Sequence, residues 1–213
     1  MLLYENDNST FPYSFKPDIL NKPPGGFLKG YQYSPQGWWW QNYIESYLKQ
    51  LKSPKRVIEC PSRKITDPIL KNFLLCGNYG VNSSICKLKT GLSSRAEFKG
   101  KPLSQTSIPK PSGTVLLLDS GFNIINYWHA TKEPPSTLNN TIEDNCYIPG
   151  AKINEQKRIW PGLEMDALKG RHWGRKINAA FVDGHLEKKK ADSFVVEKKQ
   201  TGYTNRCPLW VPK

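Results

Sequence analysis

Residues 170–190, GRHWGRKINAAFVDGHLEKKK, determine more of the predicted fold than any other stretch of this chain. Residues 176–182 are apolar and β-prone at their centre, and the residues after Gly184 alternate. Two short β-runs joined by Asp-Gly favour a hairpin, because a type I′ turn needs positive φ at both central residues. Asp183 tolerates that conformation, and Gly184 adopts it without a steric penalty. We therefore predict an antiparallel hairpin that turns at Asp183-Gly184.

The first strand of this hairpin has two mostly apolar faces. Successive side chains of a strand point to opposite sides, which places Ile177, Ala179 and Phe181 on one face and Asn178, Ala180 and Val182 on the other. Such a strand is typical of a sheet with both faces buried. We expect this strand to be covered on both sides.

The same stretch resembles the C-terminal signature of a family of bacterial prepilin-like proteins. The family is named for a His, nine residues and Asp-Gly, and it is grouped with the pseudopilins of type II secretion. The matching residues are Arg171, His172, Gly174, Asn178, Phe181, Asp183, Gly184 and His185. Ten residues separate His172 from Asp183 in this chain rather than nine. A β-bulge within residues 174–177 could absorb the extra residue.

Shorter phrases of the same family occur upstream of the signature. They are Cys60-Pro61-Ser62, residues 78–83 (NYGVNS), residues 111–120 (PSGTVLLLDS) and residues 147–150 (YIPG). The opening MLLYENDN, followed by Phe11-Pro12, is similar to the end of the family's long N-terminal helix. The resemblance implies that residues 1–10 are a remnant of that helix and that its membrane-embedded part has been removed.

The resemblance implies a non-enzymatic pilin-like subunit. Residues 1–213 would form one soluble head domain of the α+β class, with an antiparallel sheet ending in the Asp-Gly hairpin, a few helices and long loops. The full-length form would be anchored in the inner membrane and would assemble with other pilin-like subunits through its N-terminal helix. The head would then lie on the periplasmic or extracellular face of the cell envelope. Our first hypothesis is therefore a structural subunit of an envelope filament or secretion system.

Patterns outside the signature predict a few further elements. Residues 37–51 have apolar side chains at helical spacing and predict an amphipathic helix that ends at Ser53-Pro54. Residues 56–61 and 111–120 predict strands, the second one buried. Residues 192–196 could add another strand. Residues 87–110 are polar and basic, and we interpret them as an exposed insertion.

The strong positive charge supports an alternative hypothesis. The net charge of +13 favours anionic partners, and basic clusters occur at residues 188–190 and at Lys198-Lys199. The consecutive tryptophans at positions 38–40 could stack on sugars, although aromatic residues at a helix start more often dock the helix on the core. The alternative is a basic module that binds anionic glycan or nucleic acid.

The five cysteines show no zinc-type pairing. They are Cys60, Cys76, Cys86, Cys146 and Cys207. None forms a tight Cys-x-x-Cys pair, so a structural zinc is not expected. An oxidising compartment would favour disulfides, with at least one thiol left over from the odd count. Cys76 and Cys86 flank residues 78–83 and could close a local loop, but spacing alone does not decide the pairing.

Candidate catalytic and metal-binding residues are few. His172, Asp183 and His185 carry ligand types suited to a transition metal, and a metal-dependent hydrolase is the third hypothesis. Asp183 already has a structural reason to occupy a turn, so we favour a structural role for the set. The sequence has no Gly-x-Ser-x-Gly elbow and no phosphate-binding glycine loop, so we predict neither a catalytic residue nor a cofactor. Ca²⁺, which some pseudopilins bind, would need an acidic cluster that is not evident here.

Overall fold

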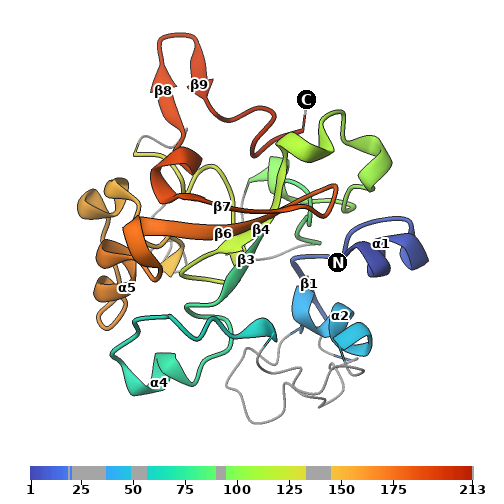
Figure 1. The fold of residues 1–213 in the computed structure, drawn as a ribbon. Helices are drawn as coiled ribbons and strands as arrows, with labels where there is room; N and C mark the ends of the chain where they lie inside the picture. Colours follow the sequence, from blue (N-terminus) through green and yellow to red (C-terminus); the bar gives the residue numbers. More distant parts are fainter. Residues whose placement is uncertain (19, 21–36, 49–56, 90–94, 133–144, 213) are drawn as a thin grey trace.

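The protein has an α+β architecture built on one five-stranded sheet (Figure 1). The computed structural model describes residues 1–18, 20, 37–48, 57–89, 95–132 and 145–212. Its α-helices are α1 (Leu2–Asn8), α2 (Trp40–Leu48), α4 (Pro68–Lys71) and α5 (Glu164–Lys169). Its strands are β1 (Phe15–Pro17), β2 (Gly37–Trp39), β3 (Tyr79–Asn82), β4 (Val115–Asp119), β5 (Ile124–Ile125), β6 (Lys176–Phe181), β7 (Leu186–Lys190), β8 (Glu197–Lys199) and β9 (Gly202–Thr204). Short 3₁₀ helices include η1 (Ala96–Phe98), η2 (Gln105–Ser107), η3 (Pro111–Gly113), η5 (Lys152–Gln156), η6 (Trp173–Arg175) and η7 (Ala191–Phe194).

The central sheet has the strand order β5-β3-β4-β6-β7. Neighbouring strands run antiparallel except for β3 and β5, which are parallel. The predicted buried strand within residues 111–120 is confirmed as β4, which lies between β3 and β6. Two small antiparallel pairs, β1-β2 and β8-β9, lie outside this sheet, and the β8-β9 hairpin projects from the body (Figure 1).

The predicted hairpin is confirmed, but its turn differs from the prediction. The Phe181 amide donates to the His185 carbonyl over 3.0 Å, and the Gly184 amide donates to the Phe181 carbonyl over 2.9 Å. Gly184 has a φ of 94°, whereas Asp183 is not among the described residues with positive φ. This pattern is a type I turn followed by a glycine bulge rather than a type I′ turn. Only the glycine therefore needs the left-handed region.

The two faces of β6 are covered unequally, so the expectation of cover on both sides is wrong for half of the strand. Ile177, Ala179 and Phe181 are buried in the larger hydrophobic cluster. On the opposite face Val182 is buried in a second cluster, but Asn178 is exposed. The sheet is consequently closed on that face near the turn and open toward the other end of β6.

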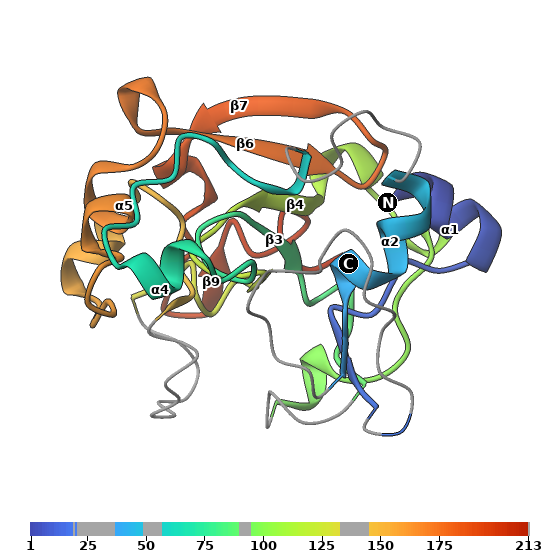
Figure 2. The same ribbon diagram turned by 90° about the horizontal axis from the view of Figure 1, so that it is seen from below.

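Helices α1 and α2 lie side by side at one end of the sheet (Figures 1 and 2). The Tyr4 ring of α1 packs edge-on against Tyr43 and Tyr47 of α2, with ring centroids 5.9 and 6.2 Å apart. Leu2 of α1 approaches Gly184 so closely that a Cβ there would lie 2.5 Å from the Leu2 Cδ1 atom. The N-terminal helix is thus docked on the turn of the signature hairpin.

The predicted helix over residues 37–51 begins later than expected. Residues 37–39 form β2, which pairs with β1, and α2 starts at Trp40. The predicted apolar position Leu51 lies outside the described residues. Trp39 and Trp40 are buried, which confirms that these tryptophans belong to the core rather than to a sugar platform.

Three other predictions for the chain are wrong in the part that the structure describes. Residues 87–110 are not an exposed insertion, because Leu88, Phe98 and Ile108 are buried in the core. Val57 and Ile58 are helical rather than extended. Residues 192–196 contain the end of η7 rather than a strand.

Neither cysteine pairing nor a membrane span is found in the described part of the chain. Cys60, Cys76, Cys86 and Cys207 are free thiols. The suggested bridge between Cys76 and Cys86 is wrong, since the two residues belong to different hydrophobic clusters. No helix among the described residues is both long enough and apolar enough to cross a bilayer.

Candidate functional site

Arg171 is the central residue of a buried ionic network at the start of β3 and the end of β4. Its side chain is fully buried and donates from Nε and Nη2 to the Asp166 carboxylate, over 2.9 and 2.8 Å. It also donates to the Asn78 carbonyl over 2.6 Å and to the Ser120 carbonyl over 2.7 Å. One guanidinium therefore connects α5 with the segments beside β3 and β4. A buried cation needs such partners, because desolvation would otherwise exceed the attraction.

Asp166 is the main counter-charge in this network. Besides Arg171, its carboxylate accepts from the Lys64 amide over 2.9 Å and from the Tyr147 hydroxyl over 2.9 Å. Burial, and then the neighbouring Asp166 carboxylate, raise the pKa of Tyr147 well above its ordinary value. The Tyr147 hydroxyl stays protonated and acts as a donor.

Asp119, the last residue of β4, is the second buried carboxylate. Its Oδ2 atom accepts from the Asn178 amide over 2.7 Å and lies 3.1 Å from His172 Nε2. Its Oδ1 atom accepts no hydrogen bond, and Arg171 Nη1 lies 3.7 Å from it. Asp119 therefore links β4 to β6 while one of its oxygens remains without a hydrogen bond.

His172 lies at the edge of the network. Its Nε2 atom also lies 3.0 Å from Asn178 Nδ2, and the side chain is 16% exposed. The segment after His172 turns tightly in η6, where Gly174 and Arg175 have φ values of 69° and 55°. From Lys176 onward β6 pairs with β7 in regular register, so the predicted β-bulge within residues 174–177 is not found.

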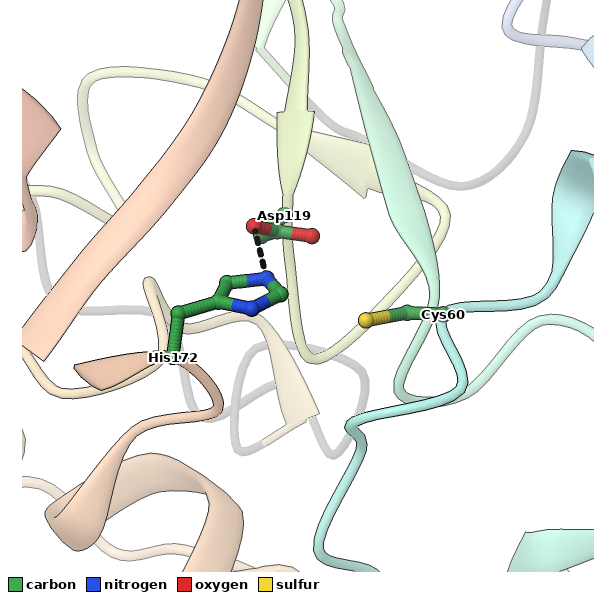
Figure 3. A group of neighbouring side chains, drawn as sticks. All are labelled: Cys60, Asp119 and His172. Carbon is green, nitrogen blue, oxygen red and sulfur yellow. Dashed lines mark hydrogen bonds and ion pairs between the residues drawn. The ribbon is translucent and has the colours of Figure 1, made fainter. Parts of the chain in front are cut away.

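Cys60 completes a group of three possible metal ligands. The ligand atoms of Cys60, Asp119 and His172 all lie within 4.8 Å of one another. Figure 3 shows the Cys60 sulfur directed toward the His172 ring and Asp119. The Cys60 amide donates to the Asn78 side chain over 3.0 Å, which holds the residue against the start of β3.

The electrostatic environment keeps the Cys60 thiol protonated. Burial raises the pKa of Cys60, and Asp119 and Asp166 raise it further, while Arg171 acts in the opposite direction. A reactive cysteine needs a lowered pKa and access to solvent. Cys60 is only 1% exposed, so it does not have the properties of a ready nucleophile.

The predicted metal set of His172, Asp183 and His185 is not brought together. His185 Nδ1 lies 2.6 Å from Asp183 Oδ1, and the His185 ring stacks on Phe181. His172 instead contacts Asp119. His129 is buried elsewhere, and burial holds its pKa well below the ordinary value. Asp183 and His185 therefore serve the turn, and only His172 belongs to the group of three ligands.

Sequence reasoning missed Asp119 and Cys60 as partners of His172. Both residues stood in quoted phrases, as the end of a predicted strand and as the start of Cys60-Pro61-Ser62. No spacing rule connects residues 60, 119 and 172, because tertiary packing brings them together: Asn78 holds Cys60, Asp119 ends β4, and His172 precedes β6. No motif or spacing in the sequence indicated Asp166 as the partner of Arg171.

The open face of the β6-β7 hairpin is basic. Lys176 lies opposite Lys190, and Asn178 lies opposite Lys188, so these side chains share one face. All three lysines are exposed and have no ion-pair partner within the described residues. Trp173, just before β6, is 94% exposed. Like charges directly opposite each other destabilise a sheet, so the pairing of Lys176 with Lys190 does not contribute to the stability of the fold.

Comparison with known proteins adds no relative: no family model matches the chain, and neither a curated protein nor a solved structure is significantly similar. The fold and the network define an α+β domain whose signature segment, residues 170–190, joins strands and helix through buried charge.

Proposed function

We propose that this protein is a non-enzymatic structural subunit, the head domain of a pilin-like protein of an envelope filament or secretion system. The role of the signature segment supports the proposal best. Arg171 and His172 contact Asp166 and Asp119, and Asn178 donates to Asp119 from β6. Three of the residues that carry the family resemblance therefore make contacts that join α5, β4 and β6, which supports a structural role.

The docking of α1 also supports this role. Leu2 contacts the hairpin turn at Gly184, and the Tyr47 hydroxyl of α2 donates to Asp7 over 2.7 Å. Leu3, on the same short helix, is 64% exposed. Because α1 packs against the turn at Gly184, the orientation of this helix is coupled to the orientation of the rest of the head. A helix coupled in this way suits a subunit that assembles through its N-terminal helix.

Localisation in cells that make the protein tests the proposal. We expect an antibody raised against residues 1–213 to detect the protein in the envelope fraction and in material sheared from the cell surface. The lysate before shearing provides the control for total amount. Recovery of all the protein in the cytosolic fraction, with none in the envelope, would contradict the proposal.

A second candidate function is binding of an anionic glycan through the open face of the β6-β7 hairpin. Lys176, Lys188 and Lys190 supply positive charge, and Trp173, three residues before Lys176, supplies an exposed aromatic surface. Aromatic rings stack on planar or sugar faces, and lysines bind acidic groups in a salt-dependent way. This face replaces the tryptophans at positions 38–40 as the candidate binding surface.

Heparin chromatography separates this candidate from a general charge effect. We expect the double variant K188Q/K190Q to elute at lower salt than the matched variant K198Q/K199Q, which removes the same charge from β8. The reason is that local contacts add to the overall field, which both variants weaken equally. Equal elution of the two variants would assign retention to net charge alone.

A further inference from the structure

We propose that Cys60, Asp119 and His172 form a binding site for a divalent transition metal of the zinc class. The three residues offer a thiolate, a carboxylate and an imidazole, which are the ligand types that such ions prefer. Their ligand atoms lie within 4.8 Å of one another and come from three separate parts of the chain (Figure 3). The proposed metal site does not depend on the filament role. It is compatible with a filament subunit and with a glycan-binding module.

The first support is a carboxylate oxygen without a hydrogen bond. Asp119 is fully buried, and its Oδ1 atom has no hydrogen-bond partner. Buried polar atoms in proteins are almost always hydrogen-bonded, and the cation that pairs with this oxygen, Arg171 Nη1 at 3.7 Å, lies beyond hydrogen-bond distance. In Figure 3 the Asp119 carboxylate and the Cys60 sulfur both face the space beside the His172 ring. A cation at that place would satisfy the oxygen.

The second support is a conflict at His172 Nε2. A hydrogen on Nε2 would suit Asp119 Oδ2 at 3.1 Å, whereas a lone pair would suit Asn178 Nδ2 at 3.0 Å. In the orientation that the structure gives the Asn178 amide, neither neutral tautomer satisfies both neighbours. A metal ion bound to the Nε2 lone pair and to the carboxylate removes the repulsion between those two atoms, and the exposed Asn178 amide must then turn away from Nε2 toward solvent.

The charges around the site are compatible with a divalent ion. Arg171 faces two carboxylates, with Asp166 at 2.8 Å through paired hydrogen bonds and Asp119 Oδ1 at 3.7 Å, so one cation is shared between two negative charges. Asp119 and a Cys60 thiolate then provide two negative charges for the ion. Metal binding to a cysteine displaces the thiol proton to solvent, so affinity rises with pH.

The geometry needs only a small adjustment. Zinc bonds of about 2.0–2.3 Å in a tetrahedral arrangement place ligand atoms roughly 3.4–3.6 Å apart. Asp119 Oδ2 lies 3.1 Å from His172 Nε2, which is close to this value, and rotation of the carboxylate would present Oδ1 to the same ion. Rotation of the Cys60 side chain can bring its sulfur closer. Three protein ligands leave one coordination position open on the partly exposed side of His172.

Cobalt binding tests the site, because Co²⁺ occupies zinc sites and reports thiolate ligation through a near-ultraviolet charge-transfer band. The purified chain is freed of metal, kept reduced with a phosphine and titrated with Co²⁺. We expect one equivalent to bind with a thiolate band that Zn²⁺ abolishes. The variant C60S should lose the band, and H172Q should bind about tenfold or more weakly.

Two matched variants make the test specific. C207S removes an exposed thiol outside the group, and H185Q removes the histidine of the turn; both should keep the band and the affinity. Thermal melting identifies any variant that fails to fold. If C60S unfolds, the cobalt affinity of H172Q decides the test. The glutamine of this variant can still donate a hydrogen bond to Asp119, so we expect the variant to fold. Absence of a thiolate band up to about 1 mM Co²⁺ would overturn the proposal, since binding weaker than that is not a specific site. Loss of the band in C207S rather than C60S would also overturn it.

Discussion

The two ends of the signature segment carry similar residues in opposite environments. At the buried end, Arg171 and His172 contact carboxylates from α5 and β4. At the turn end, His185 contacts Asp183, only two residues away, on the surface. The buried end therefore joins distant parts of the chain, while the turn end stabilises itself locally. The comparison teaches that the chemistry of a residue type is set by its burial and by the partners that the topology supplies.

The largest expected effect is at the buried end, where we predict a severe loss of stability for Arg171→Met. Removal of the guanidinium leaves Asp166 and Asp119 buried with uncompensated charge, which costs about 3–5 kcal/mol of the free energy of unfolding. Urea denaturation measures this loss. The matched variant Lys189→Met, which breaks an exposed pair with Glu187 on β7, should lose far less. Similar losses in the two variants would show that burial of the ion pairs does not decide their contribution to stability.

An intermediate effect is expected for Gly184→Ala in the turn. Positive φ costs alanine about 1–2 kcal/mol, and the new Cβ would lie 2.5 Å from Leu2 Cδ1. The control Gly174→Ala also has positive φ, but its new Cβ meets nothing within 4 Å. We expect Gly184→Ala to be the more destabilising of the two in denaturation experiments.

The difference in stability between these two glycine variants measures how strongly the packing of α1 constrains the hairpin turn. In the double variant L2A/G184A, the excess cost should disappear, because the contact with Leu2 is gone while the φ penalty remains. If the two single glycine variants lose equal stability, docking of α1 does not constrain the turn.

The smallest effect concerns titration at the turn end. The hydrogen bond from His185 lowers the pKa of Asp183 below its ordinary value of 3.8. This contact stabilises the fold above the ordinary pKa of Asp183, and the stabilisation is lost as pH falls through the lower folded pKa. Carboxyl NMR titration should show the lowered pKa in the native protein and a return toward the ordinary value in H185Q. An unchanged pKa in H185Q would show that the contact does not control Asp183.

Local patterns predicted the elements whose signals are short-range. The β6-β7 hairpin, the buried strand β4 and the burial of Trp39 and Trp40 agree with the predictions. The turn type was wrong, since both type I′ and type I with a bulge accept Asp-Gly and the choice depends on how the strands continue. The burial of Leu88, Phe98 and Ile108 was not predicted, because each is a single apolar residue within a mostly polar segment and forms no periodic pattern.

The candidate site was predicted only in part. His172 was identified from its position in the signature, and Cys60 and Asp119 were each present in a quoted phrase. Asp183 and His185 were grouped with His172 because they are near in sequence, yet they face their own turn. Proximity in sequence therefore matched the contact between Asp183 and His185 but did not identify the partners of His172.

The sequence alone determined that residues 176–190 reverse direction at a glycine, because the steric requirement of the turn and the β-propensity of its arms are local properties. It also determined the strong positive charge, which depends only on composition. The tertiary structure alone decided which carboxylates surround Arg171 and His172. Those contacts join residues 78, 119, 120 and 166 to the signature segment, and strand order and packing bring them together. Buried charges need partners from whatever backbone is adjacent in space, and that adjacency is a property of the folded chain as a whole.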